Sequence, residues 1–168
     1  NILIQPHSIR LNHENILDIF DKYDVILDGS DNFETRYLVN DACVILGKPL
    51  VFGAIYKFSG QLSVFNFENG PTYRCLFPEP PGADSLPSCA DAGVLGVLPG
   101  IIGSLQALET IKIITDIGKV MTGRVLLYDA LGQKFDELKL SADKTNQEIT
   151  ELQNYSLNLE CSTPVMKN

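Results

Sequence analysis

Two aspartates flank a short polar turn in the segment VILDGSDNFETR, residues 25–36. The segment opens with three apolar residues, as a buried strand does, and Asp28 and Asp31 follow them closely. In a doubly wound sheet, ligands usually bind at this carboxyl edge of the strands. A carboxylate there can hold Mg²⁺ that carries nucleotide phosphates, because Mg²⁺ takes one or two carboxylates together with phosphate oxygens.

The same turn also permits a purely structural interpretation. Asp31 would cap the helix that follows, and Glu34, three residues later, would complete a capping box. A cap alone stabilises a helix by about 1 kcal/mol and needs no ligand. The spacing is compatible with both roles of Asp31. Asp28 is better explained as a strand-end residue that pairs with the backbone or with Arg36.

The elements around this turn alternate between strand and helix, which predicts a parallel α/β sheet. Asn12 would cap the first helix, and Gly47 with Pro49 would end the second. The expected strands and helices are, in chain order, 2–4, 13–22, 25–27, 32–46 and 50–56.

The second half of the chain predicts an antiparallel addition to that sheet, with strands at 61–67, 124–129 and 133–140. The region 78–96 is rich in proline and glycine and predicts a long loop. After Ser141 the sequence turns polar, as a linker does, so we divide the chain into a domain at 1–140 and a polar linker or tail at 141–168.

A helix is expected to start at Pro99 and to end near 116. Its small residues either allow tight packing on the sheet or help to form a homodimer. Its expected buried stripe consists of Ile101, Ile102, Leu105, Leu108 and Ile111, and its small residues are Gly100, Gly103, Ser104 and Ala107.

Composition narrows the functional classes. The 168 residues are 45% hydrophobic and 20% charged, as in one globular domain, and the net charge of −8 argues against a nucleic-acid partner. The longest apolar run is too short to cross a bilayer, so no membrane partner is expected. Four unpaired cysteines favour a reduced, cytoplasmic setting. The chain opens on a strand-like run without an initiator Met, and we expect it to be a piece of a longer protein.

Four ordered stretches extend the DGSDN turn. They are VILDGSDNFETRYLVNDACVILGKPLVFGAIYKFSGQLSVF, YRC, SCADAGVLGVLPGIIGSLQALETIK and LLYDAL. Over about residues 2–140 these stretches resemble the carboxyl-terminal portion of the MoeB/ThiF/HesA family of ubiquitin-activating-enzyme-like adenylyltransferases. The resemblance implies an α/β fold, the carboxyl-terminal part of a Rossmann-like adenylation domain, with a mixed sheet whose parallel strands come first and antiparallel strands after.

The resemblance also implies an activity, namely ATP-dependent adenylation of the C-terminal glycine of a ubiquitin-like sulfur carrier protein in molybdopterin or thiamine biosynthesis. Asp31 matches the family's Mg²⁺–ATP aspartate. Asn32 and Arg36 match its following Asn and Arg, which would brace that corner and face the nucleotide. The carrier would be MoaD- or ThiS-like, and MoeB-like enzymes suggest a homodimer.

Two features depart from the family. No G-x-G-x-x-G phosphate loop occurs in the 168 residues, so we expect this piece alone to be inactive. Many relatives hold zinc with two C-x-x-C pairs, but here Thr72 to Cys75 keeps one cysteine of the first pair and Cys161 stands alone in the tail. We therefore expect no zinc and interpret Cys75 as a buried or partly buried thiol.

Cys89 lies in the proline- and glycine-rich loop, where two-domain relatives carry a cysteine linked to sulfur transfer or thioester formation. A loop thiol can attack an acyl-adenylate, which would make Cys89 catalytic, but neither histidine is near it in sequence, and an inert loop cysteine is the alternative. Cys43, on the inward side of a helix, is interpreted as core.

Two rival functions follow from the same residues. One is a non-catalytic docking module for a ubiquitin-like carrier, whose binding would not depend on ATP and would release no pyrophosphate. The other is a nicotinamide dehydrogenase, which rests only on doubly wound topology and lacks a dinucleotide loop in this sequence.

Overall fold

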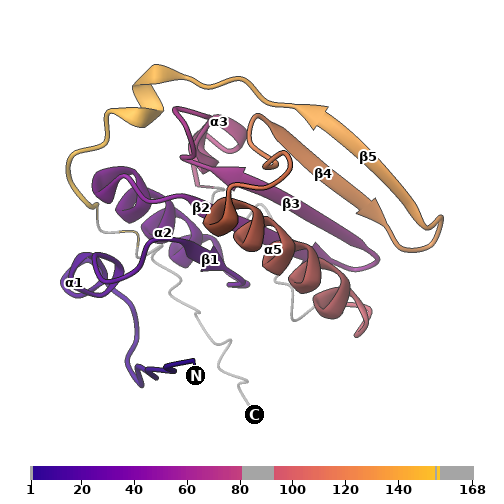
Figure 1. Cartoon of the computed structure of the whole chain (residues 1–168), viewed down its shortest axis with the longest axis horizontal. Coiled ribbons are helices and arrows are strands. Elements are labelled where there is room, and N and C mark those ends of the chain that lie inside the picture. Colours follow the sequence, from indigo (N-terminus) through magenta and orange to yellow (C-terminus); the bar gives the residue numbers. More distant parts are fainter. Residues whose placement is uncertain (1, 81–92, 154, 156–168) are drawn as a thin grey trace, which may run out of the picture.

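The computed structural model describes residues 2–80, 93–153 and 155 (Figure 1). It contains a five-stranded sheet in which the spatial order of the strands equals their order in the chain. β1 and β2 are parallel, and each later neighbour is antiparallel. The predicted mixed sheet, parallel first and antiparallel after, is therefore confirmed. The strands are β1 (Ile26–Asp28), β2 (Leu50–Tyr56), β3 (Ser59–Phe65), β4 (Arg124–Asp129) and β5 (Lys134–Lys139).

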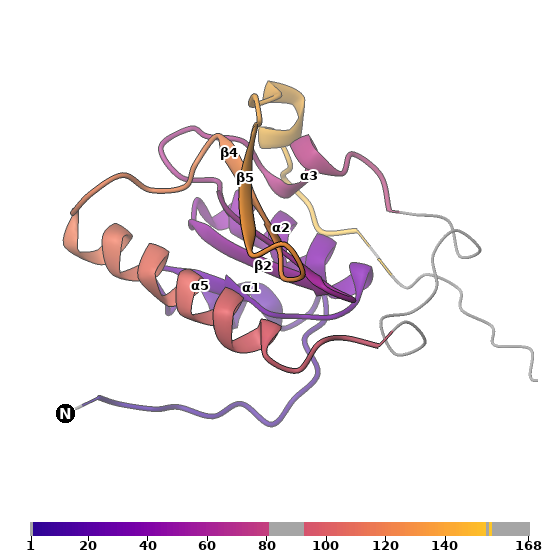
Figure 2. The same ribbon diagram turned by 90° about the vertical axis from the view of Figure 1, so that its right-hand side faces the viewer.

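Helices cover both faces of the sheet, as Figures 1 and 2 show. Because side chains alternate along a strand, Leu50 and Phe52 of β2 join the core under α1 and α2, whereas Val51 joins the core under α5. In the part of the chain that the structure describes, no helix has the length and apolar character needed to span a bilayer. The helices are α1 (Ile16–Phe20), α2 (Phe33–Leu46), α3 (Tyr73–Leu76), α5 (Leu98–Thr115) and the 3-10 helix η1 (Lys144–Gln147).

Two expectations for the start of the chain are wrong. Residues 2–4 form no strand and are at least 82% exposed, because no neighbouring strand in the described residues offers them backbone partners. Asn12 does not occupy the N-cap of α1, which is Asn15. Asn12 instead accepts the backbone N–H groups of Glu14 and Asn15 at 2.9 and 3.1 Å and folds the turn before the helix.

The expected buried stripe of α5 is also wrong in part. Leu108 and Ile111 are 47% and 50% exposed, whereas Gln106 and Glu109 are buried. The two polar residues are buried because each has partners: Gln106 donates to backbone carbonyls of β1 and β2, and Glu109 accepts the backbone N–H of Met121 at 2.8 Å. The buried side of α5 therefore combines the apolar Leu98 and Ile102 with two polar residues whose hydrogen bonds are satisfied.

The close approach between α5 and the sheet occurs at glycines of the strands. A Cβ atom at Gly53 would lie 2.5 Å from Cδ of Gln106, and one at Gly60 would lie 2.4 Å from Cδ1 of Ile102. By contrast, a Cβ at Gly100 or Gly103 of α5 would meet nothing within 4 Å. The prediction that the small residues of α5 pack on the sheet is therefore wrong at both helical glycines.

The segment after β5 lies along the domain up to Tyr155 (Figure 1). The side-chain amide of Gln147 donates to the carbonyls of Asn69 and Gly70 at 3.1 and 2.8 Å. Tyr155 packs against the core under α1 and α2, and its hydroxyl donates to Asp41. The polar composition of this segment thus coexists with specific contacts to the folded domain.

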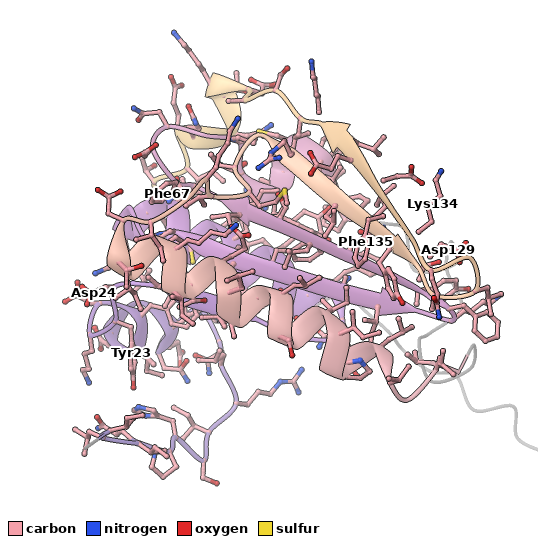
Figure 3. All side chains as sticks on the ribbon, turned by 45° about the vertical axis from the view of Figure 1, so that its right-hand side comes forward. Tyr23, Asp24, Phe67, Asp129, Lys134 and Phe135 are labelled. Atoms are coloured by element: carbon pink, nitrogen blue, oxygen red, sulfur yellow. The ribbon has the colours of Figure 1, made fainter. Side chains whose placement is uncertain are left out.

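The last two strands form a hairpin at the edge of the sheet. Figure 3 shows Asp129, Lys134 and Phe135 together on this β4–β5 hairpin.

Candidate functional site

A cavity of about 490 Å³ opens at the carboxyl edge of β1 and β2. Its walls are the turn at residues 29–31, Arg36 of α2, residues 53–55 of β2, and α5 together with Val94 just before it. The cavity thus lies where ligands bind in open α/β sheets. Two of the predicted site residues, Asp31 and Arg36, both line it.

The turn after β1 is built by Asp28. This side chain is 4% exposed, and its Oδ1 accepts the backbone N–H of Ser30 at 2.8 Å. An aspartate that accepts the N–H two residues later forms an Asx turn, which folds the chain back sharply. The turn brings residues 29–31 to the mouth of the cavity before α2 begins.

Asn32, and not Asp31, caps α2. The side-chain oxygen of Asn32 accepts the backbone N–H of Thr35 at 2.8 Å, so the expected capping box between Asp31 and Glu34 is wrong. Asn and Asp cap helices about equally well, and the local turn selects the second of the two. Asp31 is exposed, and its carboxylate accepts a single hydrogen bond among the described residues, a 3.3 Å contact from Nδ2 of Asn32. The carboxylate of Asp31 is therefore available to a ligand.

Arg36 is fixed from several directions. Its Nη2 donates to the carbonyl of Ser30 at 2.9 Å, and its guanidinium carbon lies 5.6 Å from the ring centroids of both Phe33 and Phe52. These contacts give a planar cation one preferred orientation at the wall of the cavity. The arginine contributes positive charge to the cavity that the carboxylate of Asp31 also lines, and a guanidinium is a common partner of phosphate oxygens.

Asp28 lies beneath the cavity in a less polar setting. Burial raises the pKa of Asp28, and the hydrogen bonds from Ser30 and the positive charge of Arg36 oppose that rise. The expectation that Asp28 pairs with the backbone is confirmed, and the charge of Arg36 acts on it as well.

Gln106 is a residue of this site that the sequence did not indicate. Its Nε2 donates to the carbonyls of Asp28 at 2.8 Å and Val51 at 3.2 Å, so the amide joins the last residue of β1 to the second residue of β2 beside the cavity. Gly53 leaves the space that the amide occupies. A glutamine in an apolar helix pattern gives no signal of this role, because its partners lie 78 and 55 residues earlier.

The cysteines fall into three situations. Cys43 is buried, and burial raises the pKa of its thiol, as expected for a core cysteine. Cys75 is partly buried, as expected, and its Sγ accepts the backbone N–H groups of Thr72 and Asp143 at 3.3 Å each. Cys89 and Cys161 lie outside the described residues. Within those residues, no three His, Cys, Asp or Glu side chains gather to form a metal site made of protein ligands alone.

The sequence matches known proteins along most of its length. The ThiF family model covers residues 1–149. A sulfur carrier protein adenylyltransferase of Thermus thermophilus is 55% identical over 142 residues, which are 82% of this chain and 52% of that protein. The adenylyltransferase and sulfurtransferase MOCS3 of Xenopus laevis is 50% identical over 145 residues, which are 86% of this chain and 32% of that protein.

A probable adenylyltransferase/sulfurtransferase, MoeZ of Mycobacterium tuberculosis, is 48% identical over 159 residues, which are 92% of this chain and 40% of that protein. The chain thus spans about a third to a half of the length of these relatives. A crystal structure of E. coli MccB with ATP superposes with a TM-score of 0.67 over 86% of this chain and 45% of MccB, at 12% identity. The structural likeness confirms the adenylation-type fold, and the match over residues 1–149 shows that the chain belongs to the ThiF family.

Proposed function

We propose that this chain forms part of an enzyme that adenylates the C-terminal glycine of a ubiquitin-like sulfur carrier protein. The carrier would be MoaD- or ThiS-like, and the pathway molybdopterin or thiamine biosynthesis. The observation that carries the proposal is that Asp31 and Arg36 both line one cavity on the carboxyl edge of a parallel strand pair. The printed names of the Thermus, Xenopus and Mycobacterium relatives support adenylyl transfer as the reaction class.

Asp31 would hold Mg²⁺ that accompanies ATP. The residues present fit such an ion, because the Asp31 carboxylate is exposed at the cavity and accepts a hydrogen bond from Asn32 alone among the described residues. Mg²⁺ bound with phosphates needs one or two carboxylates rather than a complete protein cage, and it neutralises phosphate charge when bound. Asn32 would brace this corner by capping α2 and by donating to Asp31.

Arg36 would face the triphosphate from its position on α2, at the wall of the same cavity. In adenylation the carrier carboxylate attacks the α-phosphate and pyrophosphate leaves, so the enzyme acts by holding the reactants in line and by opposing the phosphate charge. A guanidinium already oriented by Ser30 and two aromatic rings needs little reorganisation to do this.

The reaction is proposed for the longer protein rather than for these 168 residues alone. The chain supplies the Asp31 edge of the cavity but contains no G-x-G-x-x-G run. The remaining nucleotide contacts are therefore assigned to residues outside this sequence. By itself, the 168-residue chain is expected to release no pyrophosphate.

Carrier-dependent exchange between ATP and pyrophosphate, measured on the full-length protein, tests the proposal. Asp31→Asn removes the charge and leaves the Asn32 cap of α2 intact, so exchange should fall by about 100-fold or more while the fold is retained. Asp24→Asn is the matched control. It makes the same change at an exposed residue before the amino end of β1, beside Tyr23 in Figure 3, and should leave exchange unchanged.

Full exchange in Asp31→Asn would refute the assignment of Asp31. If the carrier binds equally with and without ATP and no pyrophosphate appears, the chain is a docking module and the adenylation proposal is wrong.

We extend the proposal to three features that the described residues leave untested. Cys89 would attack the acyl-adenylate of the carrier, forming a thioester and releasing AMP. Sulfur transfer that proceeds at an unchanged rate in Cys89→Ala would leave only an inert loop cysteine. A homodimer would cover the exposed apolar residues of α5, among them Leu108 and Ile114. The enzyme would work in the cytoplasm.

A further inference from the structure

Gly103 is a glycine that neither packing nor backbone conformation explains. It lies inside α5, where glycine is less favourable than alanine. Such a glycine usually marks a positive φ or a neighbour too close for a Cβ atom. Gly103 has neither, because its φ is not positive and a Cβ there would meet no atom within 4 Å. Gly103 does line the cavity, so its missing side chain leaves space for what enters the cavity.

The side of α5 that borders the cavity is small and uncharged. Pro99, Gly103 and Gln106 line the cavity and follow one another at intervals of four and three residues, so they share one face of the helix. Gly53 and Ala54 of β2 line the same cavity. The described lining residues include no aromatic ring, and their charged side chains come from the turn after β1 and from α2. The part of the cavity beside α5 therefore suits a thin, uncharged group.

Gln106 offers this part of the cavity a hydrogen-bond acceptor. The side chain is 8% exposed, and its Nε2 donates to the carbonyls of Asp28 and Val51. Both amide hydrogens are thereby used, which fixes the orientation of the amide. Oε1 accepts no hydrogen bond from the described residues, and the side chain lines the cavity. A ligand beside Gln106 thus finds an acceptor and no remaining side-chain donor.

The end of a peptide chain matches these properties better than the base of a nucleotide does. A peptide N–H is a donor that needs one acceptor, and a glycine without Cβ can lie close against a helix at another glycine. Adenine presents an N6 donor beside a ring-nitrogen acceptor, and proteins commonly stack bases on aromatic side chains. The α5 side of the cavity provides neither a second polar partner nor an aromatic ring.

We propose that Gly103 and Gln106 form the subsite for the last residue of the carrier. The terminal glycine would lie against α5 at Gly103, and its peptide N–H would donate to Oε1 of Gln106. Its carboxylate would then point toward Asp31 and Arg36, which line the same cavity and would hold the phosphates. Gly103 is thus a specificity-determining residue that excludes a carrier with a larger last residue. This inference rests on the proposed function.

Gly103→Ala and Gly103→Leu test the subsite in the full-length protein. The dissociation constant of the carrier is measured by titration with a non-hydrolysable ATP analogue present, using whichever of a MoaD-like and a ThiS-like carrier binds the parent protein. The Kd should rise about tenfold in Gly103→Ala and about 100-fold in Gly103→Leu, because each side chain fills space that the terminal glycine needs. The KM for ATP should stay unchanged.

Gly100→Ala is the matched control. It makes the same change in the same helix, its Cβ also meets no atom within 4 Å, and Gly100 does not line the cavity. Both alanine variants should unfold at a slightly higher urea concentration than the parent protein, since alanine favours the helix. Only Gly103→Ala should weaken carrier binding, so the loss cannot come from unfolding.

A carrier that ends in glycolate instead of glycine tests Gln106. The ester oxygen replaces the last peptide N–H at nearly the same shape, and the parent protein should bind this carrier about tenfold more weakly than the glycine form. Gln106→Met removes the acceptor, so this variant should bind the two carriers within about twofold of each other. A structural role of Gln106 alone would leave the tenfold difference in place.

Each outcome decides the proposal. A carrier Kd in Gly103→Ala within about twofold of the parent value refutes the subsite. A raised KM for ATP with an unchanged carrier Kd would assign this part of the cavity to the nucleotide and would also overturn it. If the carrier Kd changes as expected but the parent protein exchanges no pyrophosphate, the subsite stands and the adenylation proposal falls. Normal exchange with a Kd that does not depend on position 103 gives the reverse result.

Discussion

Gly53→Ala should destabilise the protein by an amount that the contact between β2 and α5 determines. The new methyl group would lie 2.5, 2.6 and 2.8 Å from the Cδ, Oε1 and Nε2 atoms of Gln106. Forcing an extra carbon into a filled site costs about 1–3 kcal/mol. If the amide moves away, its hydrogen bonds to Asp28 and Val51 are also lost, at about 1 kcal/mol each.

We therefore expect the free energy of unfolding to fall by about 3 kcal/mol, within a range of roughly 2–5. For a chain of this size, 3 kcal/mol corresponds to a decrease in Tm of about 6–12 °C. Urea denaturation followed by circular dichroism measures the change, with thermal unfolding as a second readout. Gly100→Ala serves as the control, because a Cβ there meets no atom within 4 Å, and should stabilise the helix by about 0.5 kcal/mol.

A double-mutant cycle separates this contact from a general effect on β2. Gln106→Ala removes the amide and leaves room for a methyl group at position 53, so Gly53→Ala should cost at least 1 kcal/mol less in that background than in the parent. A cost within 0.5 kcal/mol of zero for Gly53→Ala alone, or the same cost in both backgrounds, would refute the packing described for this wall of the cavity.

Three further predictions concern buried charge and thiol chemistry. Asp41→Ala should lower the free energy of unfolding by about 3–5 kcal/mol. Arg74 donates to both carboxylate oxygens of Asp41, which is 1% exposed, at 2.8 and 2.7 Å, and the substitution would leave this arginine without its ion-pair partner. Urea denaturation measures the change, and a cost below about 1 kcal/mol would contradict the buried ion pair. The pKa of Asp28 is raised in the folded protein, so the contribution of Asp28 to stability is fully present below its unfolded pKa and is lost as the pH rises through its folded pKa. The urea midpoint of the parent protein should therefore fall as the pH rises above about 4, and Asp28→Asn should flatten that fall. An identical pH profile in both proteins would disprove the shift. Cys43, which is fully buried and has a raised pKa, should be alkylated by iodoacetamide far more slowly than the partly buried Cys75. Mass spectrometry of peptides measures the alkylation rate of each cysteine, and equal rates would contradict the prediction.

Much of the fold could be predicted because local patterns agreed with global packing. β2 has the predicted bounds, 50–56, since its apolar run is buried on both faces. α2 ends at Gly47 in the left-handed conformation, as a glycine after a helical pattern indicates. The apolar run at 2–4 failed as a strand because a strand depends on a partner, which local sequence does not encode.

The sequence pointed to Asp31 and Arg36, which both line the cavity, but it did not point to Gln106. Asp31 and Asn32 are neighbours, and both residue types cap the N-terminus of a helix about equally well. The local turn that Asp28 forms leaves Asn32, rather than Asp31, at the N-cap of α2. Gln106 reaches the site through contacts distant in sequence, and neither its residue type nor its spacing reports such contacts. Buried polar residues in an otherwise apolar helix are therefore the positions where pattern reasoning failed.

The most direct test of the central claim is a crystal structure of the full-length protein with Mg²⁺ and a non-hydrolysable ATP analogue. The account predicts that a carboxylate oxygen of Asp31 lies about 2.0–2.1 Å from the metal ion, which in turn contacts the phosphates. A metal ion held by other residues, with the Asp31 carboxylate well beyond coordination distance, would contradict it.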